Sequence, residues 1–269
     1  MKIMEAIKKG FNVTSKNKGL LTVLFIFNFI WNIATLPFML KTQPANAVTL
    51  PLNAPLLVLS IIFIFLNIFM QGGVLGVLKD IIPSEGKVAL KDLVGYGKKF
   101  YVRFLGMGLF ILAILILAAL VLGIIISIAA AVKNVILNII VAVVGLALLA
   151  IALYYLFLIF FSPYALVVDD SGIFKAMGSS MRFIRGNMSR VIGISTLLLL
   201  VGLGIGVVAG VVIGIFSIVL KATAFDILTA IISSAVNSYV TVMISMALLV
   251  YYCALSGNLK KKETAEVSA

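Results

Sequence analysis

The sequence has 269 residues, of which 63% are hydrophobic and 11% are charged. A soluble domain is about half apolar and about a quarter charged, so this composition excludes a soluble, a disordered and a disulfide-rich protein. It places the chain in a lipid bilayer. There is no histidine and a single cysteine, Cys253. The chain therefore lacks the commonest general base, the commonest metal ligand and any intramolecular disulfide, so we expect no enzyme activity and no cofactor.

Six stretches reach the length of about 20 mostly apolar residues that a membrane-spanning helix needs. None contains a charged residue except Asp226, at the start of the last stretch. Ion-coupled pumps carry ionisable groups within the membrane, so their absence argues against a pump but leaves a passive pathway open. We predict an all-α integral membrane protein, with a single six-span domain over 1–259 and a tail over 260–269. Its spans are 20–40, 55–78, 104–132, 135–162, 191–220 and 225–255.

Basic residues are distributed unequally between the two sides of the predicted spans. Eighteen of the 21 Lys and Arg residues lie in the N-terminal segment, in the loops after spans two and four, or in the C-terminal tail. Only Lys41, Lys133 and Lys221 lie on the other side. Because cytoplasmic loops carry the excess of Lys and Arg, both termini should be cytoplasmic. The net charge of +12 then faces anionic lipid headgroups, and no nucleic-acid partner is expected.

A basic amphipathic segment precedes each span that leaves the cytoplasm. The predicted apolar faces are Ile3, Met4, Ile7 and Phe11; then Leu90, Leu93, Val94 and Tyr101; then Ile173, Met177, Met181 and Ile184. Asp169, Asp170 or Ser171 is expected to cap the third segment, because acids and serine favour helix starts. The pattern indicates three hairpins of spans, each behind a cytoplasmic amphipathic helix, as a parallel threefold repeat. The alternative is an ordinary set of hydrophobic hairpins with positive loops.

Polar side chains recur inside the predicted spans. Unpaired amides are costly in lipid, so these residues should turn inward and share one layer of the bundle. Two roles stay open for this layer: hydrogen bonds that fix helix packing, or a polar cleft for a headgroup or small solute. Its residues are Asn28, Asn32, Asn67, Gln71, Ser234, Asn237, Ser238 and Thr241.

Two further patterns concern packing and charge. Small residues four apart let helix backbones approach closely, so the fifth span should pack on a neighbouring helix of this chain, with a homodimer face or a hinge as the alternatives. Its residues are Gly202, Gly206, Gly210 and Gly214. Basic residues beside the third amphipathic segment should bind anionic lipid headgroups. They are Lys175, Arg182, Arg185 and Arg190.

The run from Phe161 to Arg190 resembles a poorly characterised group of prokaryotic six-span proteins. This group includes the membrane domain of some glycerophosphodiester phosphodiesterases. The matching positions are Pro163, Asp169, Asp170, Ala176, Ser180, Arg185, Gly186 and Asn187, and the Gly-rich run Gly72–Lys87 is also similar. The resemblance implies a prokaryotic plasma-membrane protein. It does not imply phosphodiesterase activity, because the histidines that such an enzyme needs are absent.

These observations lead to two functional hypotheses. The first is a non-enzymatic, lipid-interacting scaffold or accessory subunit, with membrane lipids and a membrane-protein partner or a second copy as its partners. The alternative is a passive transporter or channel for a small neutral or amphiphilic solute, which would use the polar faces of spans one, two and six.

Overall fold

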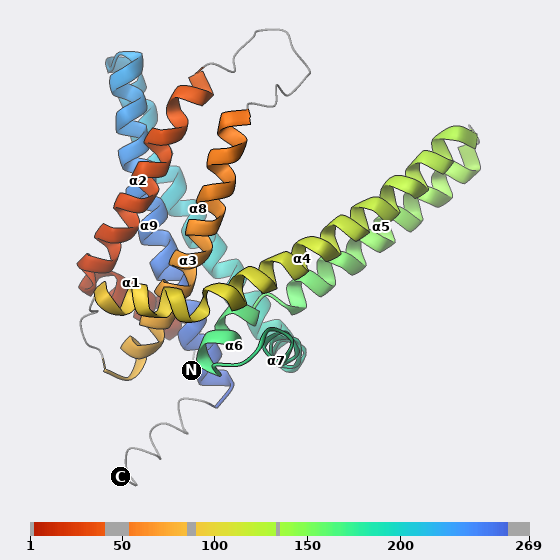
Figure 1. Cartoon of the computed structure of the whole chain (residues 1–269), viewed down its shortest axis with the longest axis horizontal. Coiled ribbons are helices and arrows are strands. Elements are labelled where there is room, and N and C mark those ends of the chain that lie inside the picture. The colour runs from red at the N-terminus through yellow and green to blue at the C-terminus, as the bar shows by residue number, and fades with distance from the viewer. Residues whose placement is uncertain (1–2, 41–53, 85–89, 133–134, 258–269) are drawn as a thin grey trace. The chain divides into compact units, whose positions relative to one another are not determined.

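A computed structural model describes residues 3–40, 54–84, 90–132 and 135–257 (Figure 1). Helices and short connections account for all of these residues. The helices are α1 (Ile3–Lys16), α2 (Lys18–Leu40), α3 (Ala54–Ser84), α4 (Leu90–Val132), α5 (Val135–Leu158), α6 (Ser162–Val168), α7 (Ile173–Gly186), α8 (Met188–Val219) and α9 (Ala222–Leu255).

Six segments are long and apolar enough to cross a membrane, which confirms the coarse prediction of an all-helical protein with six candidate spans. Each predicted span overlaps one of them. They are Lys18–Phe38, Ala54–Ile82, Lys91–Ser127, Asn138–Val168, Met188–Val219 and Ala222–Leu255. Many large apolar side chains on α4, α5 and α8 are exposed, as expected for helices whose solvent is lipid.

The structure divides into two compact units, which are described separately. Unit 1 comprises the described residues of Met1–Tyr101 and Met188–Ala269, and unit 2 comprises those of Val102–Asn187. Helix α4 has residues in both. The single six-span domain over 1–259 stays a prediction, and the tail over 260–269 lies outside the described residues.

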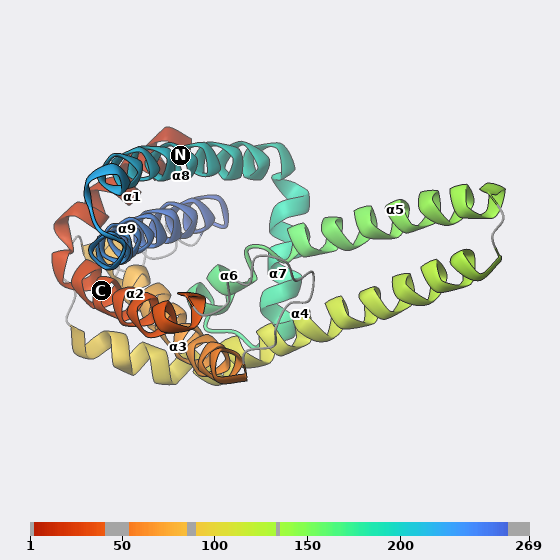
Figure 2. The same ribbon diagram turned by 90° about the horizontal axis from the view of Figure 1, so that it is seen from above.

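Helix α9 is the central helix of unit 1. It contacts α1, α2, α3 and α8, and Figure 2 shows it between α8 on one side and α2 and α3 on the other. In its most apolar stretch 67% of the residues are buried, against 17% or less in the other five span candidates. The side chains that α9 buries include Ser234, Ser238 and Met243. The core of unit 1 therefore forms around a helix that presents both apolar and hydroxyl side chains.

The first amphipathic segment forms α1, which packs on α9. Ile7 lies in the contact as predicted, whereas Met4 is 56% exposed. The contact is close because Gly10 has no side chain: a Cβ atom there would lie 2.7 Å from the Met243 carbonyl oxygen. The face that α1 buries is Ala6, Ile7, Gly10, Val13 and Thr14.

The second amphipathic segment does not form a separate helix, which corrects the prediction. It is the start of α4, which continues for 43 residues to Val132. Of the predicted apolar face, Leu93 is buried but Val94 is 46% exposed. Phe100, which was not predicted to belong to this face, is buried as well. This face packs on α3 where both helices carry glycine, since a Cβ atom at Gly73 would lie 2.5 Å from the Leu93 carbonyl oxygen.

Unit 2 contains α5, α6, α7 and the part of α4 after Tyr101. Helix α7 packs on α6 and α5. Its buried residue Ser180 joins the two, because the hydroxyl donates to the Leu158 carbonyl oxygen at 2.8 Å and accepts from the Phe161 backbone N–H at 3.1 Å. The residue at the α7 N-cap is Gly172, without a side-chain cap, so the predicted cap by Asp169, Asp170 or Ser171 is wrong.

Helices α1 and α7 share one register. Both have 14 residues, and their buried positions coincide when Ile3 is aligned with Ile173. Each helix is followed by an asparagine whose side-chain amide donates to the carbonyl four residues earlier: Asn17 to Val13 at 2.9 Å, and Asn187 to Phe183 at 3.1 Å. Asparagine favours such local bonds over helix continuation, so both amphipathic helices end at this position before a span begins.

The same alignment explains why α4 is continuous. When Gly97 is aligned with Gly10, Phe104 falls at the position of Asn17. A phenylalanine side chain cannot hydrogen-bond to the backbone, so nothing in the sequence interrupts the helix at this point.

Candidate functional site

A polar cavity of about 170 Å³ lies in unit 1 between α2, α3 and α9. Apolar side chains such as Leu24 and Val74 complete its wall. The chain carries no Asp, Glu, Lys or Arg at these positions, so the cavity offers uncharged hydrogen-bonding groups only. The polar residues that line it are Asn28, Asn67, Gln71, Asn237 and Thr241.

Helices α2 and α9 are joined by three side-chain hydrogen bonds beside this cavity. The Asn28 and Asn32 amides donate to the hydroxyls of Ser238 and Ser234, each at 2.9 Å. The Asn237 amide donates to the Asn28 side-chain oxygen at 3.4 Å. Both serines also donate to carbonyl oxygens of their own helix at 2.6 Å. These residues therefore have the geometry of interhelical hydrogen bonds that fix packing.

Two amides of α3 have a different environment. Asn67 and Gln71 line the same cavity, but no hydrogen bond joins either of them to another residue in the described part of the chain. An amide without partners in a hydrocarbon layer costs several kcal/mol. Water or a polar ligand in the cavity would supply the missing hydrogen bonds. The structure thus divides the predicted polar layer into a bonded set and a set that faces open space.

The glycine stripe of α8 does not pack as predicted. A Cβ atom at Gly202 would lie 4.0 Å from Val240 of α9, whereas one at Gly206, Gly210 or Gly214 would meet no described atom within 4 Å. Among the described residues, close packing is therefore contradicted at three of the four positions. The close glycine contacts are instead at Gly10, Gly73, Gly76 and Gly97.

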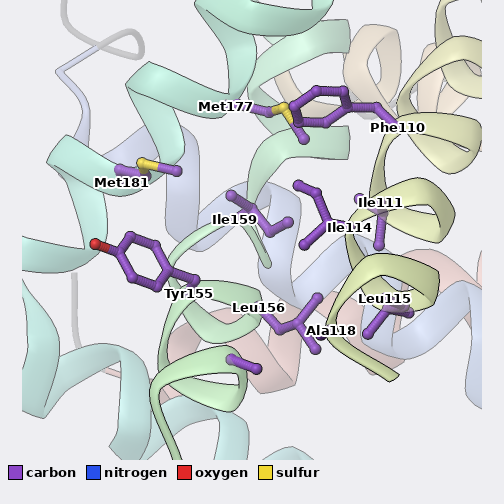
Figure 3. Close-up of a pocket in the computed structure, with 11 residues that line it drawn as sticks. Phe110, Ile111, Ile114, Leu115, Ala118, Tyr155, Leu156, Ile159, Met177 and Met181 are labelled. Atoms are coloured by element: carbon purple, nitrogen blue, oxygen red, sulfur yellow. The ribbon is translucent and has the colours of Figure 1, made fainter. Parts of the chain in front are cut away.

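Unit 2 contains an apolar groove of about 200 Å³ between α4, α5 and α7 (Figure 3). Helix α4 lines it with Phe110, Ile114 and neighbouring residues, and α7 lines it with Met177 and Met181. The one polar group among its lining side chains is the Tyr155 hydroxyl, which points away from α4 in Figure 3. No pattern in the sequence indicates this groove.

The predicted lipid-binding residues lie on two helices. Lys175, Arg182 and Arg185 belong to α7 in unit 2, and Arg190 belongs to the first turn of α8 in unit 1. All four side chains are exposed. Because the opposite face of α7 is buried, its basic residues form a polar edge on a helix that is anchored by apolar packing.

An ion pair in unit 2 was also missed. The Arg103 guanidinium lies 2.6 Å from the Asp170 carboxylate, and both side chains are about two-fifths exposed. A pair this exposed contributes little stability. The adjacent acids in the sequence pointed to a helix start, and nothing in the spacing indicated Arg103 as a partner.

The sequence profile of one family matches residues 1–255, and the family is described as a domain of unknown function, DUF7847. No curated protein and no solved structure is detectably similar to the chain. The match gives no link to glycerophosphodiester phosphodiesterases, so that resemblance stays a hypothesis. Because the profile covers all six span candidates, from α2 to the end of α9, the chain belongs to the DUF7847 family.

Proposed function

We propose that this protein is a non-enzymatic scaffold or accessory subunit of a prokaryotic plasma membrane that binds anionic lipids at its cytoplasmic face. In this proposal both termini are cytoplasmic, and the three basic amphipathic segments lie in the inner interface. Partner membrane proteins would be held or oriented through the bound lipid and the lipid-facing helices.

The main evidence for this proposal is the distribution of apolar and basic side chains on helix α7. It buries Met177, Phe183 and Ile184 against unit 2 and exposes three basic side chains, and its sequence contains no acid. Because this apolar face packs on the protein, the exposed basic edge is the part of α7 that we place at the membrane interface. Each Lys or Arg near an anionic surface contributes about 1 kcal/mol of attraction. Three such residues on α7 would together favour anionic over neutral lipid by on the order of a hundredfold.

The arrangement as three parallel repeats also belongs to this proposal. It is supported by the common register of α1 and α7, and by a small residue at the same position of all three segments: Gly10, Gly97 and Ser180. Each of these contacts another helix of its own unit closely, on α9, α3 and α5 respectively. A parallel repeat would present three basic segments to the same leaflet.

Neutralising the basic edge of α7 should reduce the binding of anionic lipid. The variant carries Lys175→Gln, Arg182→Gln and Arg185→Gln together. Nanodiscs with equal amounts of phosphatidylglycerol and phosphatidylcholine supply the lipids, and native mass spectrometry of the extracted protein counts those retained. We expect at least a tenfold loss of phosphatidylglycerol preference, larger at low salt because exposed charges are screened by ions.

The matched control is Lys221→Gln, which neutralises an exposed basic residue on the predicted outer side. It should leave the lipid preference unchanged. Equal retention of phosphatidylglycerol by the wild type and the triple variant would refute the proposed lipid-binding role.

The polar cavity of unit 1 favours a second candidate function, a passive pathway for a small neutral solute. Asn67 and Gln71 provide donors and acceptors without charge, and the cavity has room for a few waters or one small polyol, given that a water occupies about 30 Å³. A neutral solute could exchange its hydrogen bonds with water for bonds to these amides.

Glycerol flux into proteoliposomes, followed by light scattering, tests this second function. Asn67→Leu should abolish a protein-dependent flux and leave the melting temperature unchanged or raised, because it removes an amide without a partner. Asn32→Leu should instead lower the stability by about 1 kcal/mol through the lost bond to Ser234. If glycerol entered proteoliposomes no faster than protein-free vesicles, the passive pathway would be refuted. Asn67 and Gln71 would then have only a structural role.

A further inference from the structure

Side chains border the groove of unit 2 at both ends. Towards the far end of α4 and α5 the helices approach each other, since a Cβ atom at Gly145 would lie 3.9 Å from the Leu122 side chain. At the other end Met177 and Met181 of α7 lie across the space (Figure 3). Between these limits the two helices run alongside one another without extensive backbone contact. The groove is thus a defined apolar site, more than a general gap between spans.

Water is a poor occupant for this groove. A water molecule in a cavity needs two to four polar partners, and the groove offers the single hydroxyl of Tyr155 at its edge. Apolar cavities of about 150 Å³ in other proteins stay dry and bind apolar ligands. A dry, empty groove of about 200 Å³ would forfeit dispersion contacts along both walls. The chemistry of the lining therefore calls for a hydrocarbon occupant.

The size of the groove favours a single acyl chain over a helix. The lining residues of α4, from Phe110 to Ala118, extend over about 12 Å at about 1.5 Å per residue. A helix about 10 Å wide would need on the order of 900 Å³ over that length. Flexible methionine side chains, as at Met177 and Met181, adapt to chains of different shape.

The charge around the groove indicates the headgroup. Around the axis of α7, at about 100° per residue, Arg185 lies about 80° from Met177, and Arg182 lies about 100° from Met181. Both arginines are exposed, so they flank the methionines that close the groove. The described part of unit 2 contains four basic residues and two acidic ones, and Asp170 is already paired with Arg103. An anionic group beside α7 would therefore meet unpaired basic side chains.

We propose that the groove between α4, α5 and α7 holds one acyl chain of an anionic phospholipid, whose headgroup lies on Arg182 and Arg185. The inference rests on the proposed lipid-binding function and adds a specific site to it. A lipid bound in this way would connect the in-plane helix α7 to the two spans beside it.

Photo-crosslinking in nanodiscs tests the site on the full chain. The probes are phosphatidylglycerol and phosphatidylcholine with the same mid-chain diazirine, and labelled peptides are mapped by mass spectrometry. We expect phosphatidylglycerol to label Phe110–Ala118 and Ala152–Ile159 several times more than phosphatidylcholine does. Arg182→Gln with Arg185→Gln should remove this preference.

Filling the groove provides the matched comparison. Ala118→Phe and Ala152→Phe, on opposite walls, should each reduce labelling in the groove at least fivefold. Ala119→Phe and Ala150→Phe add the same ring at exposed positions outside the lining and should not. Monodisperse elution shows that each variant is folded, and the two walls provide independent tests.

The outcomes separate this inference from the proposed function. If neither groove-filling variant reduced labelling of the groove, the acyl-chain site would be overturned. If the wild type still preferred phosphatidylglycerol in the lipid-retention experiment, lipid binding by α7 would stand. Equal labelling of the groove by both probes would overturn the assignment of an anionic headgroup. If the wild type also showed no preference for phosphatidylglycerol over phosphatidylcholine in the lipid-retention experiment, the proposed function itself would be refuted.

Discussion

Substitution of Gly73 by valine should prevent the chain from reaching a stable fold. A Cβ atom at this position would lie 2.5 Å from the Leu93 carbonyl oxygen, which belongs to the backbone of α4 and cannot rotate away. Overpacking a buried contact costs about 1–3 kcal/mol for a few added atoms, and more where backbone must move. We expect the Gly73→Val protein to aggregate on size-exclusion chromatography, and Gly73→Ala to melt at a clearly lower temperature.

The control for this experiment is Gly206→Ala on the glycine stripe of α8. No described atom lies within 4 Å of a Cβ atom there, and alanine is favoured over glycine in a helix by up to about 1 kcal/mol. The melting temperature should therefore stay the same or rise. A loss of stability at Gly206 equal to that at Gly73 would show that the stripe packs closely after all.

Removal of the Ser180 hydroxyl should destabilise unit 2. Ser180 is fully buried, and its hydroxyl bonds both to Leu158 at the end of α5 and to Phe161 before α6. Each buried hydrogen bond contributes about 0.5–1.5 kcal/mol, so Ser180→Ala should lower the free energy of unfolding by about 1–3 kcal/mol. Hydrogen exchange should become faster in residues 158–168.

Ser179 provides the comparison one residue away on the same helix. Its side chain is half-buried, and its replacement by alanine should change the stability by less than about 0.5 kcal/mol. If both variants had the same effect, the hydroxyl of Ser180 would have no specific role in joining α7 to α5 and α6.

The spans and two of the amphipathic helices could be predicted because hydropathy and charge act locally. The break after α1 depends on an asparagine that recurs after α7, because the side chains of Asn17 and Asn187 bond to the preceding turn. The continuity of α4 followed from Phe104, which occupies the equivalent position. The hydropathy pattern does not distinguish an asparagine from Phe104 as a helix end. The asparagine interrupts the helix because its side-chain amide can hydrogen-bond to the backbone.

The polar residues show which part of a site the sequence of single spans does not determine. The sequence predicts one polar layer that includes Asn28, Asn67 and Asn237, and the structure places all three at one cavity. The choice of partner is set by the packing of α2 on α9, which brings Asn28 to Ser238 and leaves Asn67 facing the cavity. Helix contacts between distant segments decide this, and the sequence of a single span does not contain them.

The packing of the glycine stripe and the presence of the apolar groove could not be predicted for the same reason. A stripe of small residues permits close approach but does not supply the neighbour. In the described part of the chain, Gly202 is the one glycine of the stripe at which a Cβ atom would come within 4 Å of α9. The groove exists because α4 and α5 approach near Leu122 and Gly145 and α7 lies across its other end. Both features depend on helix placement in space.

Cysteine labelling in intact cells tests the membrane topology, on which the lipid-binding proposal depends. In a Cys253→Ser background, cysteines at Lys91 and Arg182 should react with a membrane-impermeant maleimide only after the cells are opened, whereas a cysteine at Lys221 should react in intact cells. All three positions are exposed, and the excess of basic residues places the first two inside. Labelling at Lys91 or Arg182 from the outside of intact cells would contradict the cytoplasmic placement of the amphipathic segments.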